Sequence, residues 1–83
     1  MKILVSKEVR DRRIEKEAQK IIIEAQIIAK LGEAKFYHTI FESHAGSRRI
    51  ITDRVEALSD NTVIPMDKNM SGTSVGFYIS IER

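Results

Sequence analysis

The chain has 83 residues, of which 42% are hydrophobic and 31% are charged, and it contains no cysteine. This length and composition predict one small folded domain and argue against intrinsic disorder, disulfide bonds and thiolate metal sites. Fourteen basic and twelve acidic residues leave a formal net charge of +2, which by itself gives only weak support for a nucleic-acid partner.

The sequence shows no feature of secretion or of membrane insertion. Lys2 leads into a short apolar run that is followed by charges, which does not fit a signal peptide. The most apolar segment, residues 21–31, is interrupted by charged and amide side chains and is much shorter than the ~20 residues that cross a bilayer. We therefore expect a cytoplasmic protein without a membrane partner.

The N-terminal third of the chain predicts a short strand and then a long helix. Residues 2–5 are mostly apolar and include two β-branched side chains, as in a strand. Residues 7–31 contain neither Pro nor Gly and have helical periodicity. Ser6 is suited to cap this helix, and Gly32 is suited to end it in a left-handed conformation.

This long helix is predicted to have two apolar faces. The first face consists of Ile14, Ala18, Ile21, Ala25 and Ile28, widened by Ile22 and Ala29. The second face lies on a different side and consists of Ile23, Ile27 and Leu31. A helix on the outside of a small domain needs only one apolar face. We therefore expect this helix to be enclosed on both sides, either within the domain or between subunits.

The middle of the chain predicts a strand, a turn and a second helix. Residues 35–42 are apolar on both sides of a period-two pattern, which predicts a strand that is central or covered twice. A turn follows at residues 44–47. Residues 48–58 fit a helix with Ser47 as its N-cap, although Ile50, Ile51 and Thr52 would also suit the second strand of a hairpin. The helical periodicity of residues 48–58 and the predicted N-cap at Ser47 together favour the helix.

The C-terminal third predicts two strands separated by turns. Asp60 and Asn61 form a turn before a short strand at residues 62–66, which Pro65 assigns to a sheet edge. After a polar loop, residues 75–83 form a strand with Val75, Phe77, Ile79 and Ile81 on its buried face. The whole chain, residues 1–83, is predicted as a single α+β domain of order βαβαββ, with two helices packed on a three- or four-stranded sheet.

One segment could bind an anion. If residues 48–58 are helical, the turn before them places His44, Gly46, Ser47, Arg48 and Arg49 at a helix N-terminus, where a phosphate could bind. The same residues are also explained as a plain turn with a capping serine and two solvated arginines. The spacing does not match the phosphate-binding loop, which needs a second Gly followed by Lys.

No other group of residues predicts chemistry. His38 lies in an apolar strand and His44 in a turn, without acidic or thiol partners at a metal-binding spacing, so we expect His38 to be a partly buried, satisfied histidine. The basic residues in the first half of the long helix alternate with acids, which favours a solvated face over a phosphate-binding one. The candidates for base stacking are Phe36, Tyr37, Phe41 and Tyr78, although core packing explains most of them. We expect no enzymatic activity, no metal and no cofactor.

The sequence therefore favours a small non-enzymatic protein that binds another protein, as a homo-oligomer and in a regulatory or inhibitory role. The expected interface is the excess apolar surface at Ile22, Ile23, Ile27 and Leu31. The small size, and a preference for Ile over Leu that is typical of AT-rich genomes, would suit a phage or mobile element. The alternative is a module that binds a nucleotide or nucleic acid through the turn at residues 43–49.

Overall fold

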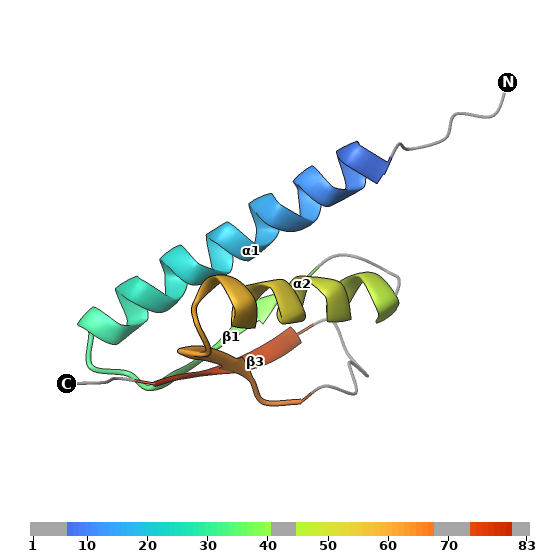
Figure 1. Cartoon of the computed structure of the whole chain (residues 1–83). Coiled ribbons are helices and arrows are strands. Elements are labelled where there is room, and N and C mark those ends of the chain that lie inside the picture. Colours follow the sequence, from blue (N-terminus) through green and yellow to red (C-terminus); the bar gives the residue numbers. More distant parts are fainter. Residues whose placement is uncertain (1–6, 41–44, 68–73, 81–83) are drawn as a thin grey trace, which may run out of the picture.

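A computed structural model describes residues 7–40, 45–67 and 74–80. Its elements are α1 (Lys7–Lys30), β1 (Lys35–Thr39), α2 (Ala45–Leu58), β2 (Val63–Pro65) and β3 (Ser74–Ile79). Both helices pack on the same face of the sheet (Figure 1). The predicted α+β class and the choice of helix for residues 48–58 are confirmed. The strand predicted at residues 2–5 lies outside the described residues.

The three strands form an antiparallel sheet of order β1-β3-β2. Because β1 and β2 both pair antiparallel with β3, they run parallel to each other, and α2 connects them across the sheet. Pro65 lies on the edge strand β2, as predicted. The prediction that the strand at residues 35–42 is central or covered twice is wrong for the described sheet, because β3 takes the central place and β1 ends at Thr39.

Alternating side chains give the sheet a buried face and an open face. Phe36 of β1 pairs with Phe77 of β3, and their rings stack with centroids 5.4 Å apart beneath the helices. The next residue along each strand, Tyr37 and Tyr78, points to the opposite face and is exposed. Within the described residues, the aromatic residues on both sides of β1 therefore do not indicate a second covering layer, since one side remains open to solvent.

Helix α1 packs through small side chains. Ala18 and Ala25 alternate with the larger Ile14 and Ile21 along its inner side, and all four are buried. The absence of a bulky group at the alanines lets the helix lie close to the layer below it. Gly32 ends the helix with φ 85°, and the Glu33 amide donates to the Ile28 carbonyl, which is the predicted C-terminal role of this glycine.

Helix α2 begins earlier than predicted. It starts at Ala45, so Gly46 and Ser47 belong to its first turn, and Ser47 is not the N-cap. The preference of serine for the cap is worth only about 1 kcal/mol, and alanine is the best helix former, so one further turn is easily added. The helix ends at Leu58, and in the turn after it Asp60 and Asn61 have φ 54° and 63°, and the Asn61 amide donates to the Glu56 carbonyl. Within the part of the chain that the structure describes, neither helix is sufficiently long and apolar to span a membrane.

The close packing of α1 predicts a clear effect of enlarging Ala18, which is completely buried. Ala18→Leu should lower the free energy of unfolding by about 1–3 kcal/mol, because the extra methyl groups force α1 away from its neighbours. The neighbouring exposed substitution Gln19→Leu should change it by less than about 0.5 kcal/mol. Urea denaturation of the two variants measures this difference, and equal stabilities would contradict the packing described here.

Candidate functional site

The outward side of α1 carries an exposed apolar stripe. Ile23 and Ile27 are each 55% exposed and Leu31 is 71% exposed. The three residues follow one another at intervals of four. Leu31 comes directly after α1, but its amide still donates to the Ile27 carbonyl, so all three share one side of the helix. We refer to Ile23, Ile27 and Leu31 as the outer stripe. No described part of the domain covers it, so enclosure of both helix faces within the described part of the domain is not observed.

The fourth predicted interface residue, Ile22, does not belong to this surface. It is partly buried and packs against the core of its own chain together with Leu58 and Ile79. Its position one residue before Ile23 turns it by about 100° toward the inner side of the helix. The interface predicted from the sequence is therefore reduced to three residues.

The outward side changes character along α1. Lys16 and Lys20 lie eleven and seven residues before Ile27, which places them on nearly the same side of the helix, and both are exposed. The outward side thus carries two lysines next to the outer stripe, on the N-terminal side of it. A partner of the outer stripe would meet apolar contacts near the C-terminal end of α1 and positive charge beside it.

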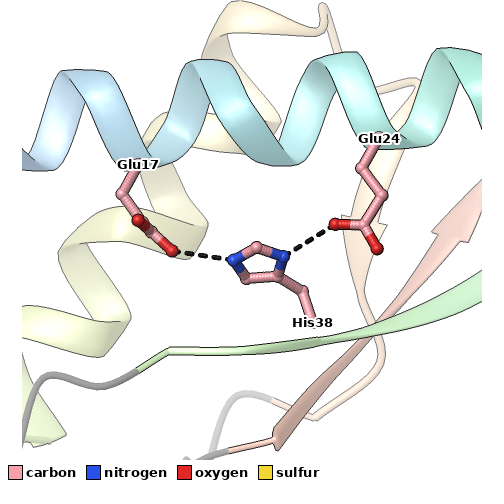
Figure 2. A network of polar contacts seen from close by, with 3 residues as sticks. All are labelled: Glu17, Glu24 and His38. Carbon is pink, nitrogen blue, oxygen red and sulfur yellow. Dashed lines mark hydrogen bonds and ion pairs between the residues drawn. The ribbon is translucent and has the colours of Figure 1, made fainter.

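A histidine holds α1 to the edge of the sheet. His38 of β1 points up between two turns of α1 and lies between the carboxylates of Glu17 and Glu24 (Figure 2). The imidazole Nε2 is 2.7 Å from Glu17 Oε1, and Nδ1 is 2.8 Å from Glu24 Oε2. Seven residues separate the two glutamates, which places them on one side of the helix about 10 Å apart along its axis. One ring can therefore bridge both.

This geometry favours a proton on each ring nitrogen. A carboxylate accepts hydrogen bonds, so two carboxylates on opposite sides of the ring favour the cationic imidazole, in which both nitrogens donate. Burial acts against the charged form and would lower the pKa of His38. The hydrogen bonds to Glu17 and Glu24, together with their negative charges, outweigh this effect and raise the pKa above its ordinary value.

The arrangement is a clamp and not a metal centre. The two carboxylates bind opposite edges of the imidazole, so they do not converge on one point where an ion could sit. Within the described residues, no group of three or more potential ligands could hold a metal ion. We refer to His38, Glu17 and Glu24 as the histidine clamp.

A second polar contact holds the other flank of α1. The Arg54 Nε of α2 donates to Glu15 Oε2 at 2.6 Å, and its Nη2 donates to Glu15 Oε1 at 3.3 Å. This bidentate bond lowers the pKa of Glu15 below its ordinary value. The helix is thus tied to α2 on one side and to β1 on the other. These contacts on both flanks oppose rotation of α1 about its own axis, and so they set the direction in which the outer stripe points.

The predicted anion site is only partly described. Gly46 and Ser47 lie in the first turn of α2, and His44 lies outside the described residues. Arg48 and Arg49 differ in exposure, since Arg48 is only 8% exposed whereas Arg49 is exposed to solvent. A phosphate arriving from solvent would therefore meet Arg49 first, and the anion site at this turn stays a prediction.

The histidine clamp was missed in the sequence because its partners are distant along the chain. His38 was correctly expected to be partly buried and satisfied, but no acidic partner was identified for it. The available signal was the spacing of Glu17 and Glu24, which is two helical turns, beside a histidine on the inward side of a strand.

Among known proteins, no family model, no curated protein and no solved structure matches this chain.

The histidine clamp makes stability depend on pH. Because the folded-state pKa of His38 is raised, its contribution is fully present below the unfolded value of about 6.5 and is lost as the pH rises through the folded value. The free energy of unfolding should therefore fall as the pH is raised from below about 6.5 through the folded-state pKa of His38. The difference between the wild type and His38→Gln should be largest at the acidic end of this range and should shrink toward the basic end.

Urea denaturation at a series of pH values measures this effect. His44→Gln provides the matched control, because it removes the only other histidine of the chain and should keep the pH dependence due to His38. A difference between the wild type and His38→Gln that stays constant across the range would show that the ring does not act as a cation in the folded state.

Proposed function

We propose that this protein acts by binding protein through the outer stripe, and that its first partner is a second copy of the same chain. The observation that carries the proposal is the exposure of Ile23, Ile27 and Leu31 on one side of a helix whose opposite side already forms the core. Removal of such side chains from water favours association by roughly 25 cal/mol per Å² of apolar surface, before the entropic costs of association are subtracted.

The fixed rotation of α1 supports a binding role for this surface. The histidine clamp and the Glu15–Arg54 pair hold the helix from both flanks, so the outer stripe is presented in one orientation. A preorganised surface loses less conformational entropy when a partner binds. The three apolar side chains therefore form a rigid strip that a flat or helical partner can cover.

The outer stripe suits pairing with its own copy. Most homo-oligomers are two-fold symmetric, and a two-fold contact places the same surface of each subunit against the other. In an antiparallel pair of α1 helices centred on Ile27, this residue would meet its own counterpart, and Ile23 would face the Leu31 of the other copy. The three side chains are uncharged, so this pairing brings no like charges together at its centre.

The small size of the outer stripe sets the expected strength of the dimer. Stable protein interfaces bury about 1,200–2,000 Å² in total, with some 20–30 residues on each side. Three apolar residues and their neighbours provide less than this. We therefore expect a dimer that dissociates on dilution, and a regulatory protein that can exchange its own copy for another apolar partner.

Substitution of two residues of the outer stripe tests the proposal. The double variant Ile23→Lys/Ile27→Lys should be monomeric at concentrations where the wild type is dimeric, because two lysines per chain would bring four positive charges together. Size-exclusion chromatography with light scattering, carried out over a series of concentrations, measures the mass. Circular dichroism and thermal unfolding should show that the variant remains folded, since both positions are exposed.

Ile50→Lys is the matched control. Ile50 is an exposed isoleucine on α2, so its replacement adds a charge at a helix surface away from the outer stripe. This variant should dimerise as the wild type does. A wild type that stays monomeric at all concentrations, or a dimer that tolerates both lysines of the double variant, would overturn the proposal.

A further inference from the structure

The open face of the sheet, which both helices leave uncovered, carries two exposed tyrosines. Tyr37 of β1 is 65% exposed and Tyr78 of β3 is 53% exposed. Tyr37 pairs with Gly76, and Tyr78 lies two residues further along the same strand, so the two phenol rings occupy diagonal positions on neighbouring strands. Such positions lie about 7–8 Å apart, within the reach of aromatic side chains.

A glycine in the central strand β3 allows the side chains on its two sides to approach each other. A Cβ atom at Gly76 would lie 2.9 Å from Tyr37 Cε1 and 2.7 Å from the Met66 sulfur, which is too close in both cases. The Tyr37 ring and the Met66 side chain therefore lean over β3 from its two sides and meet above Gly76. Gly76 itself is buried beneath them, although it lies on the open face. Most of the Tyr37 ring remains accessible from solvent.

The surroundings of the two rings are apolar on the side of β2 and basic or polar on the side of β1. Ile64 of β2 pairs with Tyr78 and is 38% exposed. Lys35 pairs directly with Tyr78 across the strands and is exposed. Thr39 and Ser74 pair at the other end of β1, and both are exposed. Among the described strand residues that face this side, none is acidic. The face thus combines two aromatic rings with a positive charge and hydroxyl groups, and its described strand residues include no carboxylate that would repel a phosphate.

We propose that the open face binds single-stranded nucleic acid, with bases stacked on Tyr37 and Tyr78 and the Lys35 ammonium near the phosphate backbone. Base stacking on aromatic side chains requires no particular base, because every base has a π face. Exposed aromatics on neighbouring strands of an open sheet, beside basic residues, are a recurrent solution for single strands. A double helix cannot bind in this way because its bases are already stacked.

This inference does not depend on the proposed protein interaction. The outer stripe lies on the side of α1 that faces away from the sheet, and the two tyrosines lie on the far side of the sheet from the helices. A dimer formed through α1 would therefore leave the open face of each copy accessible. The failure of one proposal leaves the other unaffected.

Fluorescence anisotropy tests the proposal with labelled oligothymidylate and oligouridylate of about 12 nucleotides each, at low salt. The full chain should bind at least one of them, and the comparison distinguishes DNA from RNA as the preferred strand. Tyr37→Ala and Tyr78→Ala should each weaken binding roughly tenfold, whereas Tyr37→Phe and Tyr78→Phe should bind as the wild type does, because phenylalanine keeps the stacking ring.

Two controls make the result decisive. The variant Lys16→Glu/Lys20→Glu removes positive charge from the outward side of α1 and should affect binding less than either alanine variant does. If an alanine variant unfolds by circular dichroism, Tyr37→Leu and Tyr78→Leu replace it, since they keep apolar contacts but lose the aromatic face. Absence of binding to both oligonucleotides, or binding that persists without either ring or depends instead on Lys16 and Lys20, would overturn the proposal.

Discussion

The structure depends on one constraint, which is that two layers can bury only one side of a helix. Helix α1 has apolar residues on two sides, but α2 and the three-stranded sheet lie beneath only one of them. The inner side supplies Ala18 and Ile21 to the core, and the outer side retains Ile23, Ile27 and Leu31 in contact with solvent. The excess apolar surface is therefore a consequence of the architecture, and a partner molecule is the simplest way to cover it.

The polar contacts of α1 decide which of its sides faces outward. Small alanines allow the helix to approach closely, but a smooth apolar contact alone would tolerate some rotation about the helix axis. Arg54 binds Glu15 on one flank and His38 binds Glu17 and Glu24 on the other, so rotation in either direction would break a charged hydrogen bond. Both contacts involve partly exposed groups, and their contribution is accordingly one of orientation more than of stability.

Local patterns in the sequence were sufficient to predict most of the fold. The long helix, its end at Gly32, the turn at Asp60 and Asn61 and the edge position of Pro65 each depend on residues close together in the chain, and all are confirmed. The helical period of residues 48–58 also outweighed their β-branched run. The exposed outer stripe was predicted from the same helical geometry. The prediction also included Ile22, which instead turns toward the inner side of the helix and packs against the core.

What could not be predicted depends on contacts between distant residues. The partners of His38 are 14 and 21 residues away, and the burial of Arg48 follows from the way in which α2 packs. The edge position of β1 results from the insertion of β3 between β1 and β2. The open face of the sheet becomes evident only when both helices are seen to pack on the other face. These features follow from tertiary structure, which spacing along one segment does not encode.

The central claim, that the outer stripe pairs with its own copy, is tested most directly by cross-linking at its middle residue. The chain has no cysteine, so Ile27→Cys introduces a single thiol, which a two-fold antiparallel pair of helices would place close to the same thiol of the partner. Under mild oxidation, this variant should form a disulfide-linked dimer much faster than Ile50→Cys, whose thiol would be equally exposed but distant from the pairing surface. Equal rates of cross-linking for the two variants would contradict pairing through the outer stripe.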